Sequence, residues 1–309
     1  MKTKTQPTGV YTNVEELLQL RHLAKDISLV PRKKSSAAMD GDAFSRSRGR
    51  GMEFAEVRAY QPGDDVRNID WRVTARTQKP YTKLFQEEKE RPVFLVVDQR
   101  SPMFFGSQNV FKSVYAAQIA AILAWSANQN NDRIGAMVFG DNEHNDLRAK
   151  RGKHAVLGLL NKLQMFNGRL QSPNQPSEYT CTDIINDVRR VAKPGSSVFI
   201  ISDFHDFEPD SEKPLSLLSR HSDTHLVKVF DPLERQLPGS QISVSNGSQR
   251  LKILAGSKDL YRRFHEAFEQ HEHFIRKACS NTKALSFRAD ASLPVQQWVA
   301  DVFLSHNRH

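Results

Sequence analysis

Two continuous apolar runs, each followed by an aspartate, constrain the fold of this chain more than any other feature. Residues 93–97 form the first run and precede Asp98, and residues 197–202 form the second and precede Asp203. Runs without polar alternation are typical of strands that are buried on both faces of a parallel sheet. Because parallel strands end at the same edge of a sheet, we expect both carboxylates at the edge where such sheets bind ligands.

Helical patterns alternate with apolar runs over the rest of the chain. The sequence predicts further strands at residues 134–139, 225–230 and 284–288, and helices at residues 109–128, 154–166, 183–192, 215–220, 258–279 and 295–304. Two short runs on either side of Asn246-Gly247 predict a peripheral hairpin with a two-residue turn. Strands that alternate with helices favour right-handed βαβ units. The predicted fold class is therefore α/β, with a doubly wound, mainly parallel sheet of Rossmann-like type.

The N-terminal segment, residues 1–50, combines a helical pattern with a basic stretch. Apolar residues at helical spacing over residues 14–24 predict an amphipathic helix with Asn13 as its N-cap. We expect this helix to pack on the main domain or on a partner. Basic side chains then surround a small, polar stretch, which indicates a mobile basic linker. They are Arg32, Lys33, Lys34, Arg46, Arg48 and Arg50.

The stretch from Gly51 to Arg76 brings charges, a turn and aromatic side chains close together. Gln61-Pro62-Gly63-Asp64 predicts a tight turn between two short extended arms, because proline presets the first central position and glycine accepts the positive φ of the second. Two interpretations stay open. The side chains form either a structural network that locks this arm onto the α/β domain, with Tyr60 and Trp71 as packing anchors, or a docking face, since arginine and aromatic residues are common in interface hot spots. The candidates are Arg58, Tyr60, Asp64, Asp65, Arg67, Asp70, Trp71 and Arg76.

Several segments carry a resemblance to a known family: GMEFAEVRAYQPGDDVRNIDW, the strand VFLVVD, Ile201-Ser202-Asp203, and Val229-Phe230-Asp231-Pro232-Leu233-Glu234. They resemble the bacterial domain of unknown function 58 (DUF58) family, from about Gly51 onward. The resemblance implies a fold like that of von Willebrand factor A domains. It also implies partners, namely MoxR-type AAA+ ATPases, beside which family members are often encoded, and other von Willebrand factor A-domain proteins.

The chain then divides into an N-terminal helix with its basic linker (residues 1–50), a DUF58 signature arm (51–92) and a von Willebrand factor A-like α/β domain (93–309). Longer family members carry membrane-spanning helices before the signature, so this chain resembles the short, soluble form. No apolar run approaches the ~20 residues of a membrane-spanning helix, and the N-terminus lacks the apolar region of a secretory signal. Cys181 and Cys279 are too few for a disulfide framework. We therefore expect a cytoplasmic protein without a membrane span.

The resemblance implies a metal ion-dependent adhesion site (MIDAS), in which an Asp-x-Ser-x-Ser motif, a threonine and an aspartate hold Mg²⁺ or Mn²⁺. The best matches in this chain are Asp98, Thr182 and Asp203. The first motif reads Asp98-Gln99-Arg100-Ser101-Pro102, so an arginine and a proline replace both serines. A guanidinium about 4 Å from a divalent cation would repel it by several kcal/mol.

We therefore predict a degenerate metal site, in which Arg100 replaces the cation and bridges Asp98 or Asp203 through a bidentate pair. Binding of Mg²⁺ or Mn²⁺ by the remaining carboxylates stays open as the alternative, and no other cofactor is expected.

The function suggested by the sequence is non-covalent. A glycine-rich phosphate loop, a Gly-x-Ser-x-Gly elbow and a paired-cysteine zinc pattern are absent from the sequence, so we expect no enzyme. By resemblance, we expect a protein-binding module, an adaptor or cofactor of a MoxR-type AAA+ ATPase in chaperone-like assembly or maturation of a client complex. The alternative is nucleic-acid binding, because the net charge of +9 admits sequence-independent contacts to phosphates.

Overall fold

The computed structural model of the chain describes residues 9–25, 27, 29, 52–87, 92–170, 177, 179–238, 242–245, 250–253 and 258–304. The chain divides into two compact units. We call residues 1–31 together with 91–309 the α/β unit, and residues 32–90 the signature unit. The N-terminal helix therefore groups with the sheet, whereas the sequence had suggested a separate segment of residues 1–50. The basic residues of the expected linker lie outside the described residues.

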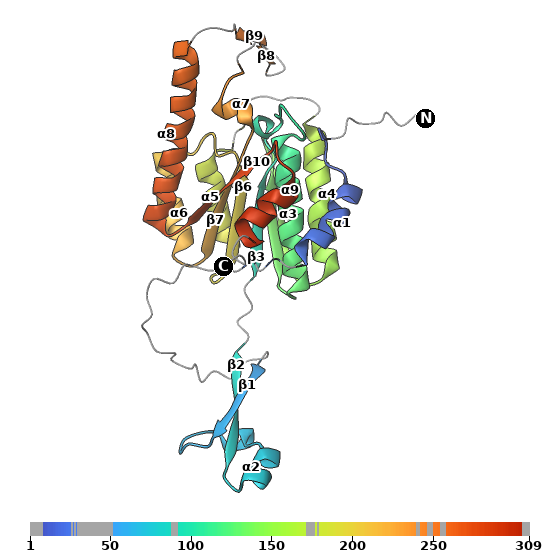
Figure 1. Cartoon of the computed structure of the whole chain (residues 1–309), viewed down its shortest axis with the longest axis vertical. Helices are drawn as coiled ribbons and strands as arrows, with labels where there is room; N and C mark the ends of the chain where they lie inside the picture. Colours follow the sequence, from blue (N-terminus) through green and yellow to red (C-terminus); the bar gives the residue numbers. More distant parts are fainter. Residues whose placement is uncertain are drawn as a thin grey trace, which may run out of the picture. The chain divides into compact units, whose positions relative to one another are not determined.

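A six-stranded sheet forms the centre of the α/β unit, in the order β10-β7-β6-β3-β4-β5 (Figure 1). Its strands are β3 (Val93–Asp98), β4 (Ile134–Phe139), β5 (His144–Lys150), β6 (Ser197–Ser202), β7 (Asp223–Phe230) and β10 (Leu285–Asp290). β3 pairs in parallel with β4 and β6, and β7 pairs in parallel with β6 and β10. β5 pairs antiparallel with β4. The predicted α/β class with a mainly parallel sheet is confirmed, but β5 was not predicted because its polar, half-exposed sequence contains no apolar run.

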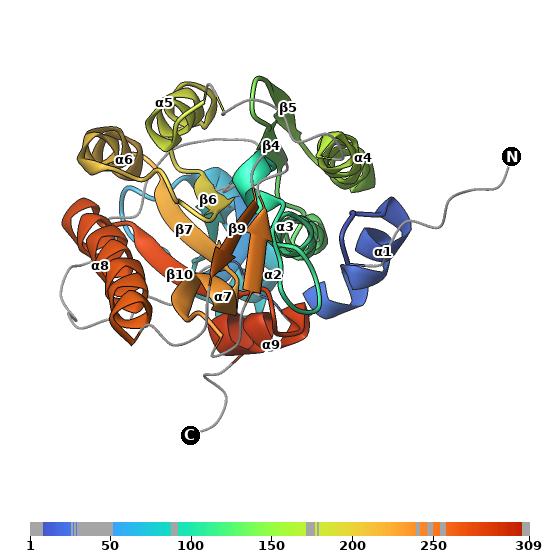
Figure 2. The same cartoon turned by 90° about the horizontal axis from the view of Figure 1, so that it is seen from above.

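Helices cover both faces of this sheet (Figure 2). One apolar cluster includes α3 (Lys112–Gln129), α4 (Lys153–Arg169) and α9 (Val295–Val299), which continues into a π-helical turn, η5 (Ala300–Leu304). The other includes α5 (Cys181–Val191), α6 (Glu212–Ser219) and α8 (Lys258–Thr282). The side chains of β3 alternate between them, since Leu95 and Val97 belong to the first cluster and Phe94 and Val96 to the second. Burial on both faces explains why this strand reads as a continuous apolar run.

The N-terminal segment completes the layer around α3. It consists of α1 (Val14–Gln19), which Asn13 caps by accepting the N–H of Glu15 at 2.9 Å, and the 3₁₀ helix η1 (Leu20–Ala24). Leu17 is 1% exposed and belongs to the same apolar cluster as α3. The hydroxyl of Ser126 in α3 donates to the carbonyl of Ile27 at 2.8 Å. The predicted packing of this helix on the main domain is therefore present.

The signature unit is a strand pair with a helical insertion. β1 (Met52–Ala59) and β2 (Tyr81–Glu87) pair antiparallel, and the 3₁₀ helix η2 (Val66–Asn68) and α2 (Trp71–Thr77) lie between them in the chain. The predicted turn is present, because the N–H of Asp64 donates to the carbonyl of Gln61 at 3.0 Å and Gly63 has φ +107°. The prediction of an extended arm after the turn was wrong. Asp65 and Asp70 each accept backbone N–H groups as N-caps, which favours helices there.

The remaining elements are short. The strands β8 (Ile242–Ser245) and β9 (Arg250–Ile253) form the predicted antiparallel hairpin. Its register pairs Ser245 with Arg250, which leaves four residues between the strands in place of the predicted two; residues 246–249 themselves lie outside the described ones. Short helical turns η3 (Ser101–Met103), η4 (Pro209–Ser211) and α7 (Pro232–Arg235) follow strands of the main sheet. No helix in the described part of the chain has the length and apolar character to cross a bilayer.

A buried histidine in β7 makes the stability of the α/β unit depend on pH. His225 is 2% exposed and stacks on Phe199, with ring centroids 4.5 Å apart. Within the described residues, neither of its ring nitrogens has a hydrogen-bond partner. Burial lowers the pKa of His225 to about 4, against the opposing effect of the Asp223 carboxylate.

We expect the unfolding free energy to fall by about 3 kcal/mol as the pH drops from about 6.5 to about 4. In this window the unfolded chain binds a proton at His225 and the folded chain does not, so protonation favours unfolding. Urea unfolding across this range should show the loss in the wild type and a smaller loss in His225→Phe. His154→Phe, at an exposed position of α4, is the matched control. Equal losses in the wild type and in His225→Phe would contradict the prediction.

Candidate functional site

The carboxyl ends of β3 and β6 lie side by side where the sheet changes its winding direction. β3 leads through α3 to β4 on one side, whereas β6 leads through α6 to β7 on the other. Asp98 ends β3 and Asp203 follows β6, so both predicted carboxylates lie at this edge, and both are buried. A topological switch point of this kind is where open α/β sheets bind ligands.

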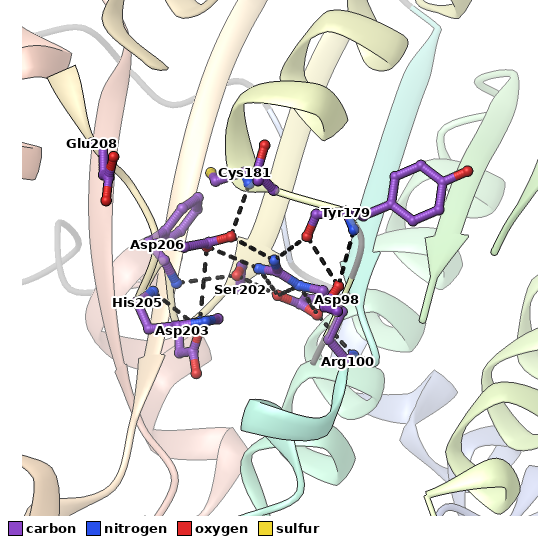
Figure 3. A network of polar contacts seen from close by, with 12 residues as sticks. Asp98, Arg100, Tyr179, Cys181, Ser202, Asp203, His205, Asp206 and Glu208 are labelled. Atoms are coloured by element: carbon purple, nitrogen blue, oxygen red, sulfur yellow. Dashed lines mark hydrogen bonds and ion pairs between the residues drawn. The ribbon is translucent and has the colours of Figure 1, made fainter. Parts of the chain in front are cut away.

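A buried guanidinium occupies this edge (Figure 3). Arg100 is 1% exposed. Its Nε and Nη2 donate to the carboxylate of Asp98 at 2.9 to 3.2 Å, and its Nη1 and Nη2 donate to Asp206 at 2.6 and 3.1 Å. Nη1 also donates to the carbonyl of Tyr179 at 2.8 Å. Every nitrogen of the side chain therefore has acceptors, which is the condition for burying this cation.

The two carboxylates keep Arg100 charged despite its burial. Burial by itself would lower the pKa of Arg100, but the charges of Asp98 and Asp206 outweigh it, so this pKa lies above its ordinary value. In return, Arg100 holds the pKa of Asp206 below its ordinary value, although burial raises it. Ser202 adds a hydrogen bond from its hydroxyl to Asp98 at 2.6 Å.

Lys112 is a second buried cation of the same edge. From the start of α3, its Nζ donates to Asp203 at 2.7 Å and to Glu234 at 2.5 Å. Burial lowers the pKa of Lys112, but the two carboxylates outweigh this effect and raise it to about 12. Burial likewise raises the pKa of Asp203, but Lys112 outweighs it, so this pKa lies far below its ordinary value. The half-exposed ring of His205 contacts the second oxygen of Asp203 through Nδ1 at 2.9 Å.

The segment 231–234 joins this network to the end of β7. Asp231 and Glu234 form a capping box at the start of α7. Asp231 also accepts the backbone N–H and the hydroxyl of Ser107, both at 2.7 Å. Because Glu234 reaches Lys112, this family-like segment connects β7, the loop before α3 and α3 itself.

The residues at this edge do not fit a divalent cation. Asp98 accepts hydrogen bonds from Arg100 and Ser202, and Asp203 accepts one from Lys112, so the protein's own cations bind the carboxylates that a metal would need. Thr182 does not join them, because its hydroxyl contacts the hydroxyl of Ser211 at 2.8 Å. Within the described residues, no three His, Cys, Asp or Glu side chains are arranged to hold a metal.

Of the two partners predicted for Arg100, Asp98 or Asp203, the structure has the bidentate pair with Asp98. Asp206 is an additional partner that was not predicted, and Asp203 pairs with Lys112. Asp206, Lys112 and Glu234 were not predicted as site residues. Lys112 could have been identified as a lysine at the start of a largely apolar helix, and Asp206 as a second aspartate only three residues after Asp203.

The remaining candidate residues lie in the signature unit, where most carboxylates serve local structure. Asp64 pairs with Arg58 at 2.9 Å, and Asp70 lies 3.5 Å from Lys83. The N–H of Tyr60 donates to the carbonyl of Pro80 at 2.8 Å, and its side chain is half-buried. By contrast, the side chain of Trp71 is 69% exposed, so Trp71 is not packed within the signature unit. Its role as an anchor against the α/β domain stays a prediction. Arg67 and Arg76 are exposed as well.

Comparison with known proteins agrees with the motifs. The family model described as "Protein of unknown function DUF58" matches residues 56–274. The chain belongs to the DUF58 family. Uncharacterized proteins of Mycobacterium bovis and Mycobacterium tuberculosis are 26% identical to this DUF58 protein over 285 residues, which cover 90% of this chain and 86% of theirs. A solved structure described as conserved hypothetical protein BatB from Bacteroides thetaiotaomicron is similar at a TM-score of 0.43 and 14% identity, over 69% of this chain and 98% of that one.

Removal of the Arg100 side-chain charge should destabilise the α/β unit by about 3 to 5 kcal/mol, because the Asp98 carboxylate would stay buried without its cation. Arg100→Met tests this by urea unfolding. The matched control is Arg262→Met in α8, whose exposed ion pairs with Asp259 and Glu266 should contribute less than about 1 kcal/mol. Equal effects of the two substitutions would show that the buried network is not a stabilising centre.

Isothermal titration with Mg²⁺ and with Mn²⁺ should detect no binding in the micromolar range, because Arg100 and Lys112 already neutralise the carboxylates. Asp210→Ala, at an exposed position in η4, is the control for Asp98→Ala. Micromolar binding that Asp98→Ala abolishes and Asp210→Ala preserves would refute the replacement of the metal by arginine.

Proposed function

We propose that this chain is a non-enzymatic protein-binding module that serves as an adaptor of a MoxR-type AAA+ ATPase in the assembly or maturation of a client complex. The observation that carries the proposal is the 69% exposure of Trp71 within the family signature. Tryptophan and arginine are enriched among the residues that dominate binding energy at protein interfaces. We therefore attribute the exposure of this tryptophan, which lies within the residues matched by the family model, to a partner that covers it.

The position of Trp71 follows from local structure. Asp70 caps α2 by accepting the N–H groups of Arg72 and Val73 at 3.0 and 3.1 Å, which places Trp71 at the first position of the helix. Val66, at the start of η2, is 60% exposed. Each apolar side chain thus opens a short helix whose capping aspartate fixes it at the surface.

The charges of the signature unit favour a partner with an acidic surface. Asp64 pairs with Arg58, while Asp65 and Asp70 cap helices. The exposed cationic side chains near Trp71 in sequence are Arg67, Arg72 and Arg76. These three aspartates therefore serve the fold of the unit, whereas the guanidinium groups of Arg67, Arg72 and Arg76 meet solvent and are available to pair with acidic groups of a partner.

The buried network of the α/β unit supports binding better than catalysis. A general acid or base must exchange its proton near the working pH, whereas the pKa of Lys112 is about 12 and that of Asp203 lies far below its ordinary value. The pKa of His205 is raised by Asp203, against burial. Its ring contacts Asp203 and Asp206, and no serine or cysteine of the described residues hydrogen-bonds to it. The support for the ATPase as the partner is the family resemblance alone.

Affinity capture from the native cell, followed by mass spectrometry, tests the proposal. The wild-type chain should recover an AAA+ ATPase, and Trp71→Ala should lower the recovery at least about tenfold, as expected for a hot-spot residue. Because Trp71 is exposed, its replacement should change the unfolding free energy by less than about 1 kcal/mol. Leu260→Ala, which shortens an exposed apolar side chain of α8, is the matched control.

Two outcomes would count against the proposal. Equal recovery of the ATPase by the wild type and Trp71→Ala would remove Trp71 from the interface. Recovery of ribosomal or DNA-bound proteins that disappear after nuclease treatment, without an ATPase, would favour sequence-independent nucleic-acid binding instead.

A further inference from the structure

A hollow of about 390 Å³ lies where α5 and α6 end. Pro194, which precedes β6, and Ser222, which precedes β7, are among its lining residues, so it lies at the amino edge of the sheet, away from the Arg100 network. Figure 2 shows the two helices next to each other on the outside of the α/β unit. Val191, Leu217 and Leu218 supply apolar surface. A hollow of this size lies in the range of about 300 to 1,000 Å³ that is usual for binding sites.

The charges around this hollow have one sign. Its charged or titratable lining residues are Arg189, Arg190, Lys193 and His221. Arg190 pairs with Asp187 on the same helix, while Arg189 and Lys193 are exposed. An apolar hollow with a cationic rim favours a ligand that combines an apolar group with carboxylates.

A second hollow extends this surface along α5. It measures about 600 Å³, and its lining includes Tyr179 before the helix and the carboxylates of Asp183 and Asp187 on the helix. Arg189 and Arg190 line both hollows, so the two hollows are neighbours on this surface. The helix between them has 11 residues, a length of roughly 16 Å. An extended chain covers this distance with about five residues, whereas a compact small molecule would fill one hollow only.

We propose that the surface along α5 binds an extended acidic segment of a partner protein. An apolar side chain of that segment enters the hollow between α5 and α6. Carboxylates on either side of it pair with Arg189 and Lys193 at the rim. Beyond Arg190 the segment continues along α5 towards Tyr179 with uncharged polar residues, because Asp183 and Asp187 line this part of the surface and would repel carboxylates. This surface belongs to the α/β unit, whereas Trp71 belongs to the signature unit. The proposed peptide binding can therefore be tested independently of the proposed adaptor role.

Fluorescence anisotropy with a labelled peptide tests this proposal on the full chain. The probe is a peptide of about ten residues with one leucine between glutamates, followed by serines and glutamines. A second peptide has alanine in place of leucine, and a third has lysines in place of glutamates. We expect micromolar binding of the first peptide, at least about tenfold weaker binding of the second, and no binding of the third.

Charge reversal locates the site. Arg189→Glu and Lys193→Glu should each weaken binding of the first peptide at least about tenfold. Lys153→Glu makes the same charge change at an exposed position of α4, on the other face of the sheet, and should leave binding unchanged. Circular dichroism verifies that all variants are folded, and Leu217→Asp, inside the hollow, gives a second test. Equal binding by Arg189→Glu, Lys193→Glu and Lys153→Glu, equal affinity for the leucine and alanine peptides, or no binding of the first peptide at millimolar concentration would overturn the proposal.

Discussion

The ion pair between Arg100 and the carboxylates of Asp98 and Asp206 is the interaction on which the rest of the α/β unit depends. Burial of a charge is costly unless the charge is paired and hydrogen-bonded. The side chains of Asp98 and Arg100 are each 1% exposed, so each needs the opposite charge of the other to be stable in the interior. Through Tyr179 and Asp206, the same guanidinium holds the segment before α5 and the loop after β6 in place. One side chain thereby joins three segments that are far apart in sequence.

Lys112 has the corresponding role on the other side of this edge, where it connects α3 with Asp203 and Glu234. Together, the two cations pair with the four carboxylates at the carboxyl edge of the sheet. The positive charge at this edge is supplied by side chains. This arrangement is consistent with recognition by protein surfaces elsewhere on the molecule, such as Trp71 in the signature unit and the surface along α5.

Parts of the fold were predictable because their signals are local. The strand at residues 134–139 and the one at residues 197–202 match the structure in full, since buried parallel strands consist of continuous apolar residues. β5 gave no such signal, because an antiparallel edge strand with half-exposed residues has a mixed composition. The second arm of the signature was predicted to be extended because the Pro62-Gly63 turn suggests a reversal between two arms, whereas Asp65 and Asp70 act as helix caps. That choice depends on which N–H groups the carboxylates meet.

The sequence by itself determined the fold class and the family, because these depend on residue type and spacing along the chain. Only the tertiary structure decided which carboxylate pairs with which cation. Asp98, Asp203 and Asp206 are all suitable by type, and the choice depends on how the loops after β3 and β6 and the start of α3 meet in space. The exposure of Trp71 was likewise a tertiary outcome, since the hydrophobicity of tryptophan suits both a core and an interface.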